Sequence, residues 1–325
     1  MLAGPAWAEP LRIATFDAGL SRDGPGLLLR DIQREEAQVM AAAETITAAQ
    51  PDILLLTGFD WDYQGQALAG FAALLEGQGV SYPYRFAARP NSGVPTGFDL
   101  DGNGRTTDPP DAQGYGRFTG DSGLAILSRY PIAAQGVRDF SSLLWRDLPD
   151  TLIAGADLTP EAQAVQRLSS TGHWDVPITL PEGELHLWAF AATAPVFDGP
   201  EDRNGRRNHD EAAFWLRYLD GAWPARPSDA PFVLLGKANL DPAKGEGRRE
   251  ALLALLTDLR LQDPLPSADT ADFGGDLGAM RVEYVLPDAR RKVLDAGVYW
   301  QTAASRHGLV WIEVDWPTGG KSGLR

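Results

Sequence analysis

Short apolar runs separated by polar turns recur along the chain and predict a series of β-strands. The runs 52–56 and 232–235 are almost continuously apolar, which is typical of strands buried on both faces. The run 11–16 instead alternates apolar and polar residues. Further strands are predicted over 82–89, 123–132, 173–178, 184–190, 281–287, 297–300 and 309–314.

Segments with apolar residues at helical spacing lie between these strands. The clearest are 34–49, which Gln50 and Pro51 would end, 65–76 and 245–259. Shorter helices are predicted over 160–167 and 210–218. Strands interleaved with helices predict an α/β protein.

The composition is that of a folded protein with a substantial core. The chain has 325 residues, enough for one large domain or two ordinary ones; 44% of them are hydrophobic and 22% are charged. The absence of cysteine excludes disulfides, thiolate metal sites and cysteine nucleophiles. No apolar run approaches the roughly 18 residues that a membrane span requires, so we expect none.

The chain is acidic, with a formal net charge of −15. We therefore expect no broad nucleic-acid-binding surface, because phosphate backbones need cationic partners. A small, locally basic site is still compatible with this charge. One candidate is the basic cluster Arg203, Arg206, Arg207 and His209, which could receive an anion or could be hydrogen-bonded within the protein.

The first residues contain a pattern associated with export. Ala6, Trp7 and Ala8 precede Glu9 in the small-x-small arrangement of a signal-peptidase site. Residues 1–8 are therefore interpreted as the remnant of a signal peptide or as a flexible N-terminus. The first interpretation predicts a periplasmic or secreted protein. A flexible tail is predicted over 318–325.

Acidic residues in two loops are candidates for cation binding or for turns. Asp99, Asp101 and Asn103 alternate as in the first half of a Ca²⁺-binding loop, but Pro110 stands where such a loop needs an acid. A structural Ca²⁺ site and a plain turn cluster both explain this segment. Asp60 and Asp62, beyond the strand 52–56, are interpreted as solvated turn acids.

Several segments share their sequence with a known family. Residues 123–132 read Gly-Leu-Ala-Ile-Leu-Ser-Arg-Tyr-Pro-Ile, and residues 281–287 read Arg-Val-Glu-Tyr-Val-Leu-Pro. With the strand end at 236–239, they resemble the endonuclease/exonuclease/phosphatase superfamily of metal-dependent phosphoesterases, which includes DNase I-like nucleases. Residues 200–211 resemble a bacterial branch of it. The resemblance implies one domain over 9–317, a four-layer α/β sandwich with two mixed β-sheets packed face to face and helices outside.

The resemblance also places the family's metal-binding and catalytic positions on this chain. Asn239 keeps the Asn that the family uses to hold the phosphate and the nucleophile. His307 keeps the family's catalytic histidine. Asp17 and Glu283 are acidic exchanges, of which the first can still bind a hard cation.

At four further positions the resemblance implies a loss of function. Gly58 stands where the family has a metal-binding Glu, and Ala191 where it has a phosphate-contacting His. Lys237 replaces an Asp that holds the nucleophile and the phosphate, and Arg306 replaces an Asp that binds metal or orients the histidine. Two cations in place of two acids disfavour a divalent ion in this pocket.

These substitutions lead to a hypothesis about function. We expect Lys237 and Arg306 to replace the metal by pairing with Asp17 and Glu283, so that Mg²⁺ or Mn²⁺ does not bind there. The protein would then be an exported, catalytically inactive homologue that binds an anionic small molecule or a protein at Lys237 and Arg306. Two alternatives are a metal-dependent phosphoesterase with a rearranged site, built from the kept and exchanged residues, and a Ca²⁺-stabilised extracellular interaction module.

Overall fold

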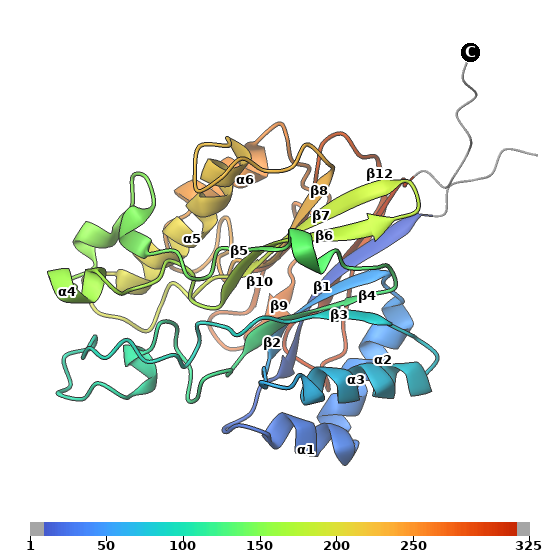
Figure 1. The fold of residues 1–325 in the computed structure, drawn as a ribbon, viewed down its shortest axis with the longest axis horizontal. Coiled ribbons are helices and arrows are strands. Elements are labelled where there is room, and N and C mark those ends of the chain that lie inside the picture. The colour runs from blue at the N-terminus through green and yellow to red at the C-terminus, as the bar shows by residue number, and fades with distance from the viewer. Residues whose placement is uncertain (1–9, 317–325) are drawn as a thin grey trace, which may run out of the picture.

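Two β-sheets packed face to face form the centre of the computed structural model, which describes residues 10–316 (Figure 1). The six-stranded sheet has the order β12 (Val293–Tyr299), β13 (Leu309–Val314), β1 (Leu11–Leu20), β2 (Ile53–Phe59), β4 (Gly123–Ser128) and β3 (Tyr84–Phe86). The five-stranded sheet has the order β11 (Glu283–Pro287), β8 (Phe232–Lys237), β7 (Gly183–Ala191), β6 (Gly172–Leu180) and β5 (Arg138–Asp139). Both are mixed, because β1 and β2 pair in parallel, as do β7 and β8, whereas the other pairs are antiparallel.

Helices cover the outer face of each sheet (Figure 1). Helices α1 (Leu27–Gln33), α2 (Ala37–Ala49) and α3 (Gln66–Gly77) share a buried cluster with the six-stranded sheet. Helices α5 (Arg203–Leu219) and α6 (Glu250–Thr257) do so with the five-stranded sheet, and the short α4 (Pro160–Gln163) lies beside them. A two-stranded sheet of β9 (Ala271–Asp272) and β10 (Ala279–Met280) completes the structure. The predicted four-layer α/β sandwich is therefore confirmed.

The alternation of side chains along buried strands fills two cores at once. In β2, Ile53 and Leu55 point into the core between the sheets, whereas Leu54 and Leu56 pack against the helices. This arrangement explains why the run is continuously apolar. On the opposite side of the molecule, Trp188 of β7 stacks on Phe232 of β8, with ring centroids 3.8 Å apart.

Several element boundaries differ from the predicted ones. Helix α5 begins at Arg203 rather than at residue 210, because its first turns are polar and show no apolar spacing. Helix α6 begins only at Glu250, because Gly245 and Gly247 adopt positive φ values of 69° and 117° and hold the chain in turns. Helix α1 was not predicted.

The predicted terminal segments, residues 1–8 and 318–325, lie outside the described residues. Within 10–316, none of the helices combines the length and the apolar character that crossing a bilayer demands.

Candidate active-site region

Three of the predicted site positions lie side by side at one end of the five-stranded sheet. Lys237, the last residue of β8, is in register with Ala191 of β7 on one side and with Glu283 of β11 on the other. Asp17 comes from β1 of the opposite sheet. The two sheets therefore meet at Lys237.

Lys237 and Asp17 form an ion pair that joins the sheets, with Lys237 Nζ donating to Asp17 Oδ2. The side chains are only 16% and 8% exposed. Burial alone would raise the pKa of Asp17, but Lys237 outweighs this effect and holds that pKa below its usual value. Burial likewise works against the charged form of Lys237, and the Asp17 carboxylate nevertheless raises the pKa of the lysine. Both groups are thus charged at neutral pH, and this half of the expected pairing is formed.

Glu283 pairs with His307 instead of with a lysine or an arginine. Its Oε1 lies 2.5 Å from His307 Nδ1, and its Oε2 accepts a hydrogen bond of 2.5 Å from the hydroxyl of Thr270. Burial opposes protonation of His307, but the Glu283 carboxylate raises its pKa above the usual value. Possible ligand atoms of Asp17, Glu283 and His307 all lie within 4.8 Å of one another.

Arg306 does not take the place expected for it. Its side chain is exposed, and within residues 10–316 it forms no ion pair or side-chain hydrogen bond. Its backbone carbonyl accepts a hydrogen bond of 2.9 Å from the amide of Asp272. The expected pairing of Arg306 with the site acids is therefore wrong, because adjacent residues in this turn point to different sides.

Gly58 leaves space that the carboxylate of Asp17 fills. The glycine has a positive φ of 63°, and a Cβ atom added to it would lie 2.5 Å from Asp17 Oδ1. A side chain here would therefore meet both backbone strain and a steric clash. The Asp17 carboxylate can therefore occupy this position only because residue 58 has no side chain.

A cavity of about 600 Å³ opens beside this cluster. Four of the predicted site positions line it: Gly58, Ala191, Lys237 and Asn239. Asn239 has a positive φ of 53°, and its side-chain amide donates to the carbonyl of Ala192 at 2.6 Å. The acids and His307 are not among the lining residues, so Lys237 stands between them and the cavity.

Two members of the basic cluster also line this cavity. Arg203 and Arg207 project from α5, so that with Lys237 the wall carries three cationic side chains and no carboxylate. Arg207 is buried and donates to backbone carbonyls, including that of Leu168 at 2.9 Å, and burial lowers its pKa to about 10. Arg203 donates one N–H to the carbonyl of Leu100.

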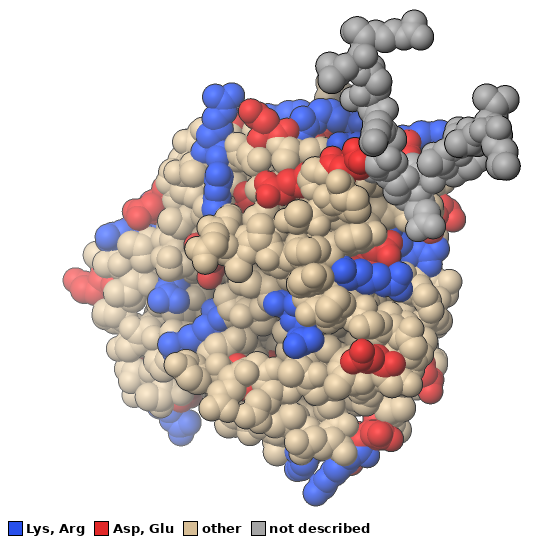
Figure 2. Space-filling view, turned by 45° about the vertical axis from the view of Figure 1, so that its right-hand side comes forward, with Lys and Arg blue, Asp and Glu red and all other residues tan. Residues whose placement is uncertain are grey.

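The other two members of the basic cluster do not line the cavity and are hydrogen-bonded within the protein. Arg206 donates to the carbonyl of Glu201 at 2.9 Å, and His209 Nδ1 lies 2.9 Å from a carboxylate oxygen of Asp210. All four members of the cluster are therefore hydrogen-bonded within the protein, and Arg203 and Arg207 also line the cavity. On the face seen in Figure 2, Lys and Arg are interspersed with Asp and Glu and do not gather into one broad basic area.

The loop considered as a Ca²⁺ site or a turn cluster contains several hydrogen-bonded turns. Asp99 accepts hydrogen bonds from the backbone amides of Gly102 at 2.8 Å and Gly104 at 2.8 Å. Carboxylate oxygens of Asp99, Asp101 and the buried Asp111 lie within 4.8 Å of one another. Asn103, the third predicted ligand, turns its amide nitrogen toward Asp101 at 3.0 Å, and its oxygen accepts from the Arg105 backbone. Asp111 was not expected in this cluster.

The acids beyond β2 differ in their surroundings. Asp62 accepts backbone hydrogen bonds at the start of α3, from Gln66 at 2.9 Å and Ala67 at 2.8 Å, as a turn acid does. Asp60 is only 5% exposed, so its interpretation as a solvated residue is wrong. Its oxygens accept from the backbone amides of Arg22 and Ser122, which fold over it from distant parts of the chain.

Comparison with known proteins identifies the family. The model of the Endonuclease/Exonuclease/phosphatase family matches residues 27–307, and the chain belongs to this family. No curated protein matches the sequence.

Solved structures support the same fold. An endonuclease/exonuclease/phosphatase from Beutenbergia cavernae DSM 12333 has a TM-score of 0.62 at 17% identity, covering 94% of this chain and 71% of that one. A family protein from Leptotrichia buccalis C-1013-b has a TM-score of 0.55 at 15% identity, covering 94% and 100%. The 3'-5' exonuclease NExo from Neisseria meningitidis has a TM-score of 0.51 at 17% identity, covering 94% and 100%.

Proposed function

We propose that this protein is a catalytically inactive member of its family that binds an anionic ligand in the cavity beside Lys237. The observation that carries the proposal is the charge of the cavity wall. In a chain of net charge −15, the wall bears Lys237, Arg203 and Arg207 and no carboxylate. Lys237 is paired with Asp17 and Arg207 interacts with the buried Glu211, whereas Arg203 forms no ion pair within residues 10–316, so its positive charge is the one best able to attract an anion.

The state of the acids supports the loss of hydrolysis. A divalent cation at Asp17, Glu283 and His307 would have to displace the ammonium group that already pairs with Asp17. Even two unit positive charges about 4 Å apart repel by roughly 4 kcal/mol at an effective dielectric of 20. The donor set therefore does not fit Mg²⁺ or Mn²⁺ as long as Lys237 is charged.

The cavity also favours a ligand with an apolar part. Its lining includes Tyr115 and Phe197, whose side chains are 64% and 92% exposed. Phe197 has a positive φ of 69°, which is a strained conformation for an aromatic residue. An anion attached to an aromatic or apolar body could contact Lys237 with its charge and these rings with its body.

The first test is hydrolysis by the full chain. Plasmid DNA and a chromogenic phosphodiester would be incubated with Mg²⁺, Mn²⁺, Ca²⁺ or a chelator, with His307→Ala as control. We expect no turnover above the control. Metal-dependent turnover that His307→Ala abolishes would overturn the proposal.

The second test is binding of phenyl phosphate, measured by titration calorimetry. We expect Arg203→Gln and Lys237→Met each to weaken binding, whereas Lys244→Met should not, because Lys244 pairs with Asp269 elsewhere on the surface. Arg203→Gln makes the test independent of the ion pair to Asp17. Binding that is absent, or equal in all variants, would contradict the proposed ligand class.

One observation favours the second candidate, a phosphoesterase with a rearranged site. The ligand atoms of Asp17, Glu283 and His307 are close enough to share a cation if Lys237 moves away. The same hydrolysis assay distinguishes the two candidates, since only this one predicts metal-dependent turnover.

A further inference from the structure

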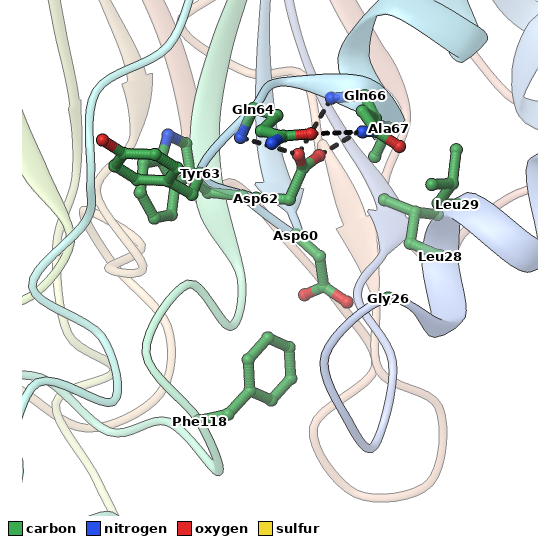
Figure 3. Close-up of a pocket in the computed structure, with 11 residues that line it drawn as sticks. Gly26, Leu28, Leu29, Asp60, Asp62, Tyr63, Gln64, Gln66, Ala67 and Phe118 are labelled. Atoms are coloured by element: carbon green, nitrogen blue, oxygen red, sulfur yellow. Dashed lines mark hydrogen bonds between the residues drawn. The ribbon is translucent and has the colours of Figure 1, made fainter.

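A second cavity lies at Asp60, just beyond the end of β2 at Phe59. It has a volume of about 310 Å³, at the lower end of the range for small-molecule sites. Its wall is formed by the start of α1, the turn before α3 and the loop at Phe118 (Figure 3). None of the predicted site positions lines it, so it is distinct from the cavity at Lys237.

The charge of this wall is opposite to that of the first cavity. Asp60 and Asp62 line it, and no lysine or arginine does. Asp62 is occupied by the backbone amides of α3, whereas Asp60 points into the space between Phe118 and Gly26 (Figure 3).

Asp60 has the properties of a carboxylate that lacks its cationic partner. Only 5% of Asp60 is exposed, yet within residues 10–316 it forms no ion pair. Two backbone amides donate to it, from Arg22 at 2.8 Å and Ser122 at 3.0 Å, and the Ser21 hydroxyl also hydrogen-bonds with it, but no cationic group reaches it. Burial, with a contribution from the neighbouring Asp121 carboxylate, raises the pKa of Asp60 to about 6, and a cation in the cavity would stabilise its charged form.

The nearby cations of the protein are held elsewhere. The Arg22 guanidinium donates to Asp31 at 2.7 Å and to Gln38 at 2.8 Å. Arg117, next to Phe118 in the sequence, pairs with Asp23 at 2.6 Å. Neither side chain lines the cavity.

Three aromatic residues contribute to the lining of this cavity. Trp61 and Tyr63 stand edge to face, with ring centroids 6.4 Å apart, and Phe118 faces the cavity below Asp60 (Figure 3). Leu28 and Leu29 close the opposite side (Figure 3). Aromatic faces attract cations, and aromatic residues that share a cavity with a carboxylate offer alkylated ammonium groups both contacts.

We propose that this cavity binds a small organic cation, an alkylated ammonium group, with its charge against Asp60 and its alkyl groups against the aromatic rings. The ammonium would supply the counter-charge that Asp60 lacks. A metal ion is a poorer occupant, because the wall offers apolar contacts and one available carboxylate in place of several oxygen ligands.

The test is calorimetric titration of the full chain with tetramethylammonium chloride at constant ionic strength, with tert-butanol as an uncharged probe of similar size. We expect tetramethylammonium to bind and tert-butanol not to bind. Tyr63→Leu should weaken binding about threefold, because it removes one ring face, whereas Tyr115→Leu at the other cavity should have no effect. Asp60→Asn should weaken binding about tenfold or more.

Asp60 also holds two backbone segments, so the fold of Asp60→Asn must be checked by near-UV circular dichroism. Tyr63 is 90% exposed, and its replacement therefore keeps the test valid even if Asp60→Asn unfolds. Absence of tetramethylammonium binding, equal binding of tert-butanol, or wild-type affinity in Tyr63→Leu would each overturn the proposal. None of these results depends on the ligand of the Lys237 cavity.

Discussion

Replacing Lys237 by methionine should destabilise the protein, because it leaves Asp17 buried without a cation. Methionine keeps an unbranched apolar stem and removes only the ammonium group and its charge. Asp17 is 6% exposed, so water can replace little of the lost interaction. At the usual ion-pair separation of about 2.8 Å and an effective dielectric of about 20, Coulomb's law gives roughly 6 kcal/mol.

The expected loss is smaller than this Coulomb energy. Removing one partner of a buried pair typically costs about 3–5 kcal/mol. Besides Lys237, His307 also acts against the effect of burial and lowers the pKa of Asp17. Some favourable charge therefore remains in the variant, and we expect a loss of about 3 kcal/mol in the free energy of unfolding.

The assay is urea unfolding at pH 7, followed by tryptophan fluorescence. Lys244→Met is the matched control: its ion pair to Asp269 is exposed, and its removal should have a much smaller effect. Combining Lys237→Met with Asp17→Asn should restore much of the stability, because no unpaired charge is left. The reasoning is refuted if Lys237→Met is no less stable than Lys244→Met, or if the double variant is as unstable as the single one.

The pH dependence gives the same prediction a second readout. In the wild type, the lowered pKa of Asp17 means that its contribution is present above the usual value of 3.8 and is lost as the pH falls through the folded-state pKa. In Lys237→Met, burial without the lysine should raise this pKa. The difference in stability between the two proteins should therefore shrink in acid.

Three further predictions concern other parts of the site and the acidic loop. His307→Gln should lose more stability at pH 6 than at pH 9. Burial opposes protonation of His307, but Glu283 raises its pKa, so the protonated histidine stabilises the fold below pH 6.5 and this contribution is lost as the pH rises through the folded-state pKa. Equal losses in urea unfolding at the two pH values would contradict this. Gly58→Ala should lower the free energy of unfolding by about 1–3 kcal/mol, and by more than Gly65→Ala does. Both glycines have a positive φ, but only at Gly58 would an added Cβ meet a neighbouring atom. Equal melting temperatures of the two variants would show that the clash is relieved. If the acidic loop binds Ca²⁺, then Ca²⁺ should raise the melting temperature of the wild type and not of Asp99→Ala, and no shift in either protein would leave the loop as turns alone.

The pattern of apolar residues predicted most of the strands because burial leaves a direct trace in residue order, whereas the four layers were implied by the family resemblance. Continuous apolar runs such as that of β2 arise where one strand serves two cores, and the closing strand β13 was predicted with its observed bounds. Helix α1 was missed because it is short and has a left-handed Gly26 at its start. Formation of α1 depends on tertiary packing more than on the pattern of its own residues.

The site was only partly predictable. Family resemblance located Lys237 and Asp17 separately, and their pairing follows from electrostatics. The contact between Gly58 and Asp17, and the hydroxyl of Thr270 that holds Glu283, connect distant parts of the chain and leave no local signal. Asp60 was misjudged for the same reason, because the segments that bury it come from elsewhere in the sequence.

The fit between Asp17 and Gly58 makes this part of the site sensitive to single substitutions. An acid introduced at position 58 would meet the carboxylate of Asp17 at once, both as a clash and as a like charge. Replacing Asp17 alone by a smaller, uncharged residue would leave the ammonium group of Lys237 buried without its carboxylate partner. Each of these single substitutions thus gives a less stable protein, and only coordinated changes at several positions would avoid this loss of stability.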